Sequence, residues 1–114
     1  MPDCLFCGIV AGEVPATIVS ANSRTVAFRD INPQAPVHIL IVPRVHYANL
    51  AELGAAEADL LADLVAHARD VAVGEGIVDA GYRVVFNTGQ QAGQTVEHVH
   101  AHVLGGRPMS WPPG

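Results

Sequence analysis

The segment His98-Val99-His100-Ala101-His102-Val103-Leu104 carries a histidine at every second position and an apolar residue after each one. Successive side chains of a β-strand point to opposite faces of its sheet, so this alternation predicts a strand over Val96–Leu104 with three imidazoles on one face. Val99, Ala101 and Val103 would then face the core. Three imidazoles buried in apolar packing would leave too many ring nitrogens unpaired, so the pattern favours a functional site.

The rest of the chain predicts four more strands and one long helix. Short strands are expected at 17–20 and 25–29, joined as a hairpin, and at 37–42 and 82–87. Apolar residues at three- and four-residue spacing from Ala55 to Gly74 predict one long amphipathic helix, with His67 on its surface or at an interface. This order of elements indicates an α+β domain with a mainly antiparallel sheet.

Length and charge restrict the class of protein. A chain of 114 residues, half of them hydrophobic, predicts a single domain over 1–114, and the surplus of apolar residues suggests an oligomer. The net charge is −5, and the six basic residues are scattered arginines, so neither nucleic acid nor an anionic membrane is an expected partner. The absence of lysine excludes a Walker-type phosphate loop and a Schiff base.

The chain carries no pattern of a secretory signal and no apolar run of the roughly 18 residues that a membrane span needs. A cytoplasmic location is therefore expected. Cys4 and Cys7 are too close in sequence to staple a fold, which agrees with a reducing compartment.

Two uses of the three histidines compete. Neutral imidazoles bind zinc, and a neutral imidazole can also attack phosphorus as a covalent catalyst. The preceding loop, residues 87–95, is rich in glycine and in amide or hydroxyl side chains, which suits a phosphate group. The loop favours covalent catalysis on a phosphate ester or amide.

Taken together, these segments resemble the histidine triad (HIT) family, and within it the Hint branch of nucleoside phosphoramidases. The resemblance rests on segments 4–11, 28–36, 38–43 and 93–106 and on the ending Trp111-Pro112-Pro113-Gly114. It implies a five-stranded sheet with one long helix and a short N-terminal helix, and a ten-stranded sheet across a homodimer. The tail 107–114 would lie at that dimer interface, where Trp111 would reach the partner's active site.

The resemblance also implies a reaction. His100 would attack the phosphorus of a purine nucleoside phosphoramidate of AMP or GMP type, with acyl-adenylates as further candidates, and form a nucleotidyl-histidine that water hydrolyses. His102 would bind the phosphate or the leaving group, and His98 with His38 would support a relay that orients the nucleophile. No cofactor would be required for catalysis.

Further positions of the resemblance would bind the substrate. Phe28, Asp30 and Ile31 would form the nucleoside pocket, in which a carboxylate can accept both ribose hydroxyls. The phosphate or leaving group would meet a set of loop residues: Asn87, Gly93, Gln94 and Thr95. Thr95 stands where serine is commoner in the family, and Glu97 stands where an aromatic residue is frequent.

Several family members hold a structural zinc, and the resemblance implies that Cys4, Cys7, His46 and His98 would form such a site here. Two cysteinates and two imidazoles make a closed tetrahedral set. The two cysteines could instead be small buried apolar residues.

Two other functions stay open. The chain could be a nucleotide-binding regulatory or scaffold dimer whose hydrolysis is incidental. It could also be a zinc hydrolase that uses the three histidines as ligands and zinc-activated water as the nucleophile.

Overall fold

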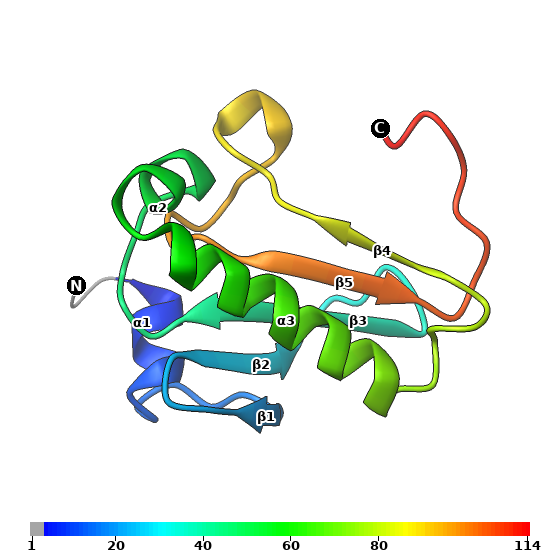
Figure 1. Cartoon of the computed structure of the whole chain (residues 1–114), viewed down its shortest axis with the longest axis horizontal. Helices are drawn as coiled ribbons and strands as arrows, with labels where there is room; N and C mark the ends of the chain where they lie inside the picture. Colours follow the sequence, from blue (N-terminus) through cyan, green and yellow to red (C-terminus); the bar gives the residue numbers. More distant parts are fainter. Residues whose placement is uncertain (1–3) are drawn as a thin grey trace.

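The computed structural model describes residues 4–114, and within them a five-stranded antiparallel sheet has the strand order β1-β2-β3-β5-β4. Its strands are β1 (Ile18–Ala21), β2 (Thr25–Arg29), β3 (Val37–Pro43), β4 (Tyr82–Val85) and β5 (Ala101–Gly105). The helices are α1 (Leu5–Val10), α2 (Leu50–Ala56), α3 (Ala58–Gly74) and a 3₁₀ turn, η1 (Gln90–Ala92). The expected α+β class, with its long helix and short N-terminal helix, is confirmed (Figure 1).

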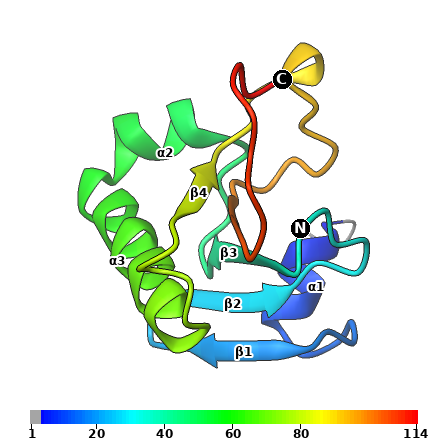
Figure 2. The same cartoon turned by 90° about the vertical axis from the view of Figure 1, so that its right-hand side faces the viewer.

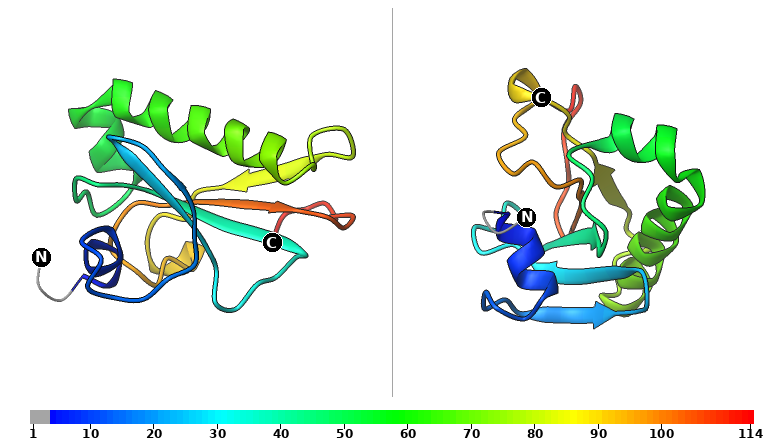
Figure 3. Two further views of the ribbon diagram at one scale, coloured as in Figure 1. Left: turned by 90° about the horizontal axis from the view of Figure 1, so that it is seen from below. Right: turned by 90° about the vertical axis from the view of Figure 1, so that its left-hand side faces the viewer.

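The two faces of the sheet are covered by different helices. The long helix α3 lies across one face, and α1 lies against the opposite face (Figures 2 and 3). The larger core, which includes Leu60, Leu64 and Ile39, lies under α3, and a second cluster forms around Phe6 and Phe28 beside α1. Strand β3 is buried on both faces because it is central, which explains why all of its residues except His38 are apolar.

The helix predicted from Ala55 to Gly74 is interrupted at Glu57, where α2 ends and α3 follows. Glu57 leaves the helical region with φ −143° and ψ 76°. Its carboxylate accepts hydrogen bonds from the Tyr47 hydroxyl at 2.7 Å and from the Arg24 guanidinium at 3.1 Å. These long-range contacts, which periodicity cannot reveal, accompany the break.

The strand predicted over Val96–Leu104 is wrong in its first half, because β5 begins only at Ala101. The partner strand β3 ends at Pro43, which has no N–H to continue the ladder. Its carbonyl instead accepts a hydrogen bond from the His98 ring at 2.9 Å. The β3–β5 ladder therefore stops short of the first two histidines, where the chain is held by this ring contact and by a hydrogen bond from the Val99 N–H to the Tyr47 carbonyl at 2.7 Å.

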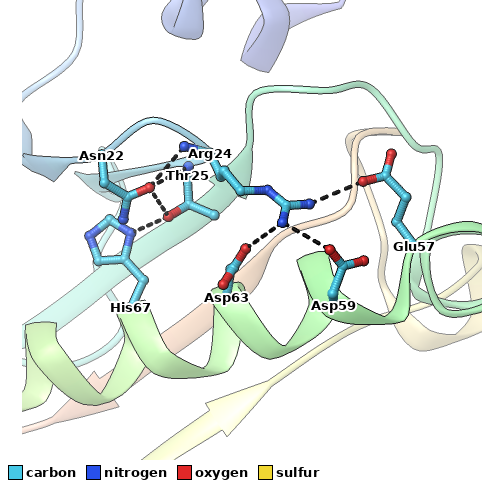
Figure 4. Close-up of polar contacts among 7 residues, drawn as sticks. All are labelled: Asn22, Arg24, Thr25, Glu57, Asp59, Asp63 and His67. Carbon is cyan, nitrogen blue, oxygen red and sulfur yellow. Dashed lines mark hydrogen bonds and ion pairs between the residues drawn. The ribbon is translucent and has the colours of Figure 1, made fainter.

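His67 was expected on a surface or at an interface, and this expectation is wrong for the chain described, because His67 is only 5% exposed. Its Nδ1 lies 2.6 Å from the Thr25 hydroxyl and its Nε2 lies 2.7 Å from the Ser20 hydroxyl (Figure 4 draws the Thr25 contact). The Thr25 hydroxyl also donates to Asn22 Oδ1 at 3.2 Å. This polar network, centred on the buried side chains of Thr25 and His67, joins α3 to the β1–β2 hairpin.

A second link between the hairpin and α3 is ionic. The Arg24 guanidinium lies within 3.1 Å of three carboxylates at the start of the helix, those of Glu57, Asp59 and Asp63 (Figure 4). The Arg24 side chain is 37% exposed, so solvent screens these pairs.

None of the helices within residues 4–114 is long and apolar enough to cross a membrane.

We predict that the buried network stabilises the fold more than the ion pairs do. Thr25→Val leaves Nδ1 of the buried His67 without a partner and lowers the free energy of unfolding by about 1–3 kcal/mol. Arg24→Gln lowers it by about 1 kcal/mol or less. Urea denaturation measures both values, and a larger loss for Arg24→Gln would contradict this ranking.

Candidate functional site

The three histidines of the alternating segment gather beside α1, although two of them precede β5. The Phe6 ring of α1 meets the rings of His98 and His100 edge-on at centroid distances of 6.1 and 5.0 Å. The centroids of the His100 and His102 rings are 4.9 Å apart. Side-chain alternation therefore still brings the three imidazoles to one side, where His98 and His100 are buried and His102 is half-buried.

A main-chain carbonyl fixes the proton position on His100. Its Nδ1 lies 2.8 Å from the carbonyl oxygen of His98. A carbonyl oxygen only accepts hydrogen bonds, so Nδ1 must carry the proton and Nε2 must hold the lone pair. In the neutral ring, this tautomer leaves Nε2 as the nucleophilic nitrogen of His100.

A main-chain N–H gives His102 the opposite tautomer. The N–H of Gln34 donates to His38 Nδ1 at 3.0 Å, so the proton of neutral His38 is on Nε2. That Nε2 donates to His102 Nδ1 at 2.9 Å. His102 therefore carries its own proton on Nε2. The neighbouring rings of His100 and His102 offer one lone pair and one N–H donor.

Burial keeps these imidazoles neutral. Desolvation lowers the pKa of His38, His98 and His100, in each case as the largest cause. Desolvation, with repulsion from His100 and His38, lowers the pKa of His102 to about 4. The nearby Asp30 carboxylate acts against the shift for His38, His100 and His102 and does not reverse it. The tautomers deduced above therefore apply near pH 7.

A pocket of about 300 Å³ opens beside His100 and His102. Phe6, Ile9 and Leu40 are among the apolar residues of its wall. Its polar lining residues are few: Arg29, Asp30, Thr95, His100 and His102. An apolar cavity with a few convergent polar groups is the usual form of a small-molecule site.

Four of the residues expected to bind substrate line this pocket: Phe28, Asp30, Ile31 and Thr95. Phe28 is buried and stacks edge-on with Phe6 at 5.4 Å, whereas Ile31 is 97% exposed. One Asp30 oxygen accepts from the Asn32 N–H at 2.8 Å, and the other lies 3.4 Å from His38 Nε2.

The other expected contacts lie outside the pocket lining: Asn87, Gly93, Gln94 and Trp111. Gln94 Oε1 accepts from the Gly89 N–H at 2.9 Å, and its Nε2 donates to the carbonyls of Ala48 and Val96 at 2.7 and 3.0 Å. Its amide thus braces the loop before β5. Trp111 is 83% exposed on the C-terminal segment.

Sequence reasoning missed two contributors to the site. Phe6 forms part of the pocket wall, and its place as a large aromatic residue between two cysteines was the available signal. The Gln34 contribution is a main-chain N–H, which leaves no signal in the sequence.

A second cluster lies behind the triad. One ligand atom each from Cys4, Cys7, His46 and His98 lies within 4.8 Å of the others. The Cys4–His98, Cys7–His46 and Cys7–His98 sulfur–nitrogen distances are 3.4, 3.4 and 3.5 Å, and the two Nδ1 atoms are 3.2 Å apart. Because His98 Nε2–H donates to the Pro43 carbonyl, its Nδ1 lone pair faces this cluster.

These distances fit one tetrahedral zinc ion. Zinc bonds of about 2.3 Å to sulfur and about 2.05 Å to nitrogen imply sulfur–nitrogen edges of about 3.6 Å and nitrogen–nitrogen edges of about 3.3 Å. Burial raises the pKa of the Cys7 thiol, with the Cys4 thiol adding to the shift, so Cys7 would lose its proton on binding a metal. The four residues could hold a structural zinc.

Asp30, His38 and His102 also lie within 4.8 Å of one another, but their hydrogen bonding does not fit a metal. A metal on His38 Nε2 would move the ring proton to Nδ1, where the Gln34 N–H already points.

The His98 ring does not touch His100 as a relay partner would. His98 orients His100 through its carbonyl, while its ring faces the cysteine cluster.

The chain is similar to known proteins over most of its length. The model of the HIT domain family matches residues 11–109. The 14 kDa zinc-binding protein of Zea mays is 47% identical, over 96% of this chain and 87% of that protein. The adenylylsulfatase HINT1 of Arabidopsis thaliana is 43% identical, over 96% of this chain and 76% of that protein.

Solved structures agree. A HIT family hydrolase from Legionella pneumophila has a TM-score of 0.95 and 48% identity, over 98% of this chain and all of that one. A histidine triad nucleotide-binding protein from Candida albicans has a TM-score of 0.83 and 32% identity, over 96% of this chain and 83% of that one. A zinc-bound histidine triad protein from Mycobacterium smegmatis has a TM-score of 0.82 and 29% identity, over 93% and 76%.

The alternating histidines, the pocket beside them and these likenesses lead to one conclusion: the chain belongs to the histidine triad (HIT) family.

Proposed function

We propose that this HIT protein hydrolyses purine nucleoside phosphoramidates through a covalent nucleotidyl-histidine at His100. The observation that carries the proposal is the hydrogen bonding that implies opposite tautomers, a lone pair on His100 beside an N–H on His102, at a pocket that also presents a carboxylate. A nucleophile next to a hydrogen-bond donor suits attack on a phosphorus atom whose oxygens need neutralising.

The nucleoside would bind along the apolar wall of the pocket. The Asp30 carboxylate would accept the two ribose hydroxyls, since an ionised carboxylate has several free lone pairs. The base would lie between Phe28 and Ile31, and the exposed Ile31 side chain would lose solvent contact on binding. Asn87, Gly93 and Gln94 would need loop movement to reach the substrate, so Thr95 is the better candidate for a phosphate contact. Trp111 would instead reach the pocket of the partner in the expected dimer.

In the first step the lone pair of His100 Nε2 forms a bond to phosphorus. The bond from phosphorus to the amine breaks, its electron pair goes to the amine nitrogen, and that nitrogen takes a proton from solvent. The nucleotidyl-imidazole ring keeps its Nδ1 proton and becomes positively charged. The His98 carbonyl then accepts a charge-assisted hydrogen bond, which is stronger than the one in the free enzyme and so lowers the barrier.

In the second step water attacks phosphorus and the bond to His100 Nε2 breaks. The electron pair returns to the ring, and the proton of the water passes to solvent. His102 would donate its Nε2–H to a phosphate oxygen in both steps, with the Thr95 hydroxyl as a second donor. A neutral donor suffices here, which agrees with the low pKa of His102.

The relatives support a nucleotide with a good leaving group on its phosphate. One is an adenylylsulfatase by name and another a nucleotide-binding protein. Acyl-adenylates are further candidates on the same grounds. A scaffold role without selected turnover is the alternative. A hydrolase that uses triad-bound zinc is disfavoured because the free nitrogen of His98 faces the cysteine cluster, while His102 Nδ1 accepts the hydrogen bond of His38.

The zinc ion is part of this proposal. Cys4, Cys7, His46 and His98 would hold it, and it would join the N-terminal segment to the end of β3 and the start of the triad. Its role would be structural, with no part in the reaction. Relatives named as zinc-binding or zinc-bound support it.

The homodimer and the cytoplasmic location stay predictions. Exposed apolar residues on the edge strand β4 and on α3, namely Tyr82, Val84, Val65 and Val73, support a ten-stranded sheet shared by two copies. The tail 107–114 would lie at that interface. The mass of the protein in solution, by sedimentation, tests this assembly.

His100→Ala should abolish turnover of an adenosine phosphoramidate panel, on the order of 10³-fold or more, because the nucleophile is lost. Binding of AMP should persist, since the pocket wall is intact. Steady-state kinetics, calorimetry and acid-quench trapping of a labelled adduct measure these effects. Equal turnover in both proteins would reject the covalent mechanism, and negligible turnover in the unmodified protein would favour the scaffold role.

The unmodified protein should contain about one zinc ion per chain, and Cys4→Ser should lose it because a thiolate ligand is removed. His38→Gln is the matched control, since it removes an imidazole from the Asp30–His38–His102 cluster and should leave the zinc content unchanged. Metal analysis by mass spectrometry decides. Zinc retained by Cys4→Ser and lost by His38→Gln would refute the cysteine site.

Stability should fall as pH drops because His102 is buried as the neutral form. Its folded pKa of about 4 lies below the ordinary 6.5, so the unfolded chain binds more protons between these values. The stabilisation is present above pH 6.5 and is lost as pH falls. Urea denaturation measures the free energy of unfolding at pH 7 and at pH 5. The decrease between these two pH values should be smaller in His102→Asn than in the unmodified protein, by up to about 2 kcal/mol. Parallel losses would contradict the buried neutral state.

A further inference from the structure

We infer that the main-chain N–H of Gln34 is the positioning group that decides which ring nitrogen of His102 carries its proton. This inference rests on the proposed function, in which His102 donates a hydrogen bond to the phosphate. Gln34 lies in the loop between β2 and β3, and its N–H reaches His38 Nδ1 at 3.0 Å. The Gln34 side chain takes no part in this contact, because its amide donates to the Asn32 carbonyl.

The pair His38–His102 has two possible arrangements when considered alone. His38 Nε2–H can donate to His102 Nδ1, or His102 Nδ1–H can donate to His38 Nε2, and either satisfies the 2.9 Å contact. Only the first leaves His102 with an N–H for the substrate. In the second, the remaining nitrogen of His102 would present a lone pair to phosphate oxygens and repel them.

The Gln34 N–H removes this ambiguity. In the second arrangement the proton of His38 would be on Nδ1, and two N–H groups would face each other across 3.0 Å. Such a contact both loses a hydrogen bond and adds repulsion between two donors. The Gln34 N–H therefore selects the first arrangement without touching the substrate, because it acts on His102 through His38.

Asp30 also favours a proton on His38 Nε2, through its oxygen at 3.4 Å. That contact is longer, and ribose hydroxyls would compete for the same carboxylate in the proposed complex. The Gln34 N–H belongs to the main chain and has no such competitor. It is the anchor that persists when substrate is bound.

Residues 106 and 107, which follow β5, hold the loop that carries Gln34 in place. The Arg107 guanidinium donates to the Gln34 carbonyl at 3.0 Å. Gly106, with φ +89°, packs so closely on Pro36 that a Cβ at this position would lie 2.9 Å from the proline ring. The end of the strand that carries His102 thus supports the loop that sets its tautomer.

Gln34→Pro tests the inference, because proline is the one residue without a main-chain N–H. Gln34→Ala is the matched control, since it keeps the N–H and removes only the side chain. Long-range ¹H–¹⁵N correlation spectra report the tautomers of His38 and His102, and steady-state kinetics separate kcat from KM. In Gln34→Pro we expect His102 to be a mixture of tautomers and no longer purely the Nε2–H form. We also expect kcat to fall about tenfold with little change in KM. Gln34→Ala should resemble the unmodified protein.

A second variant avoids any effect of proline on folding. An ester oxygen in place of the amide nitrogen of residue 34 deletes the N–H and keeps the side chain, and it should give the same result. His102 retained as pure Nε2–H in both variants would overturn the inference and leave Asp30 as the anchor. The tautomer readout requires no turnover, so it tests the inference even if the unmodified protein hydrolyses no phosphoramidate, which would refute the proposed function alone.

Discussion

The site depends on hydrogen bonds between main-chain groups and buried imidazoles. Burial holds the histidines neutral by lowering their pKa values, and a neutral imidazole has one donor and one acceptor nitrogen. The carbonyl of His98 takes the donor of His100, and the N–H of Gln34 takes the acceptor of His38. Main-chain groups cannot change their protonation state near neutral pH, so they impose fixed and opposite roles on two adjacent, chemically identical side chains.

The two faces of the sheet have different roles, because one holds the larger core and the other holds the site. The α3 face holds the larger core and the His67 network, which fix the hairpin that leads into the loop carrying Asp30. The α1 face holds the smaller cluster, the pocket and the two cysteines. His98 connects these parts: its ring nitrogens contact the cysteine cluster and Pro43, and its carbonyl orients His100. A metal at the cluster would hold the same residue that orients the proposed nucleophile.

The sequence predicted the elements whose pattern is local. The hairpin strands, the apolar strand β3 and the long helix were found within a few residues because periodicity and turn residues define them. The prediction for the first half of the histidine strand was wrong. Regular pairing with β3 stops there, and the His98 ring contacts the carbonyl of Pro43, 55 positions away in the sequence. His67 was misplaced because its partners come from a distant hairpin. Gln34 could not be found at all, since a main-chain N–H is common to nearly every residue.

Neutron diffraction from deuterated crystals at neutral pH locates the ring protons and so tests the central claim most directly. The account predicts deuterium on Nδ1 of His100 and on Nε2 of His38 and His102, with His100 Nε2 bare towards the pocket. Deuterium on both nitrogens of His100, or on Nδ1 of His102, would contradict the division into nucleophile and donor on which the proposed reaction depends.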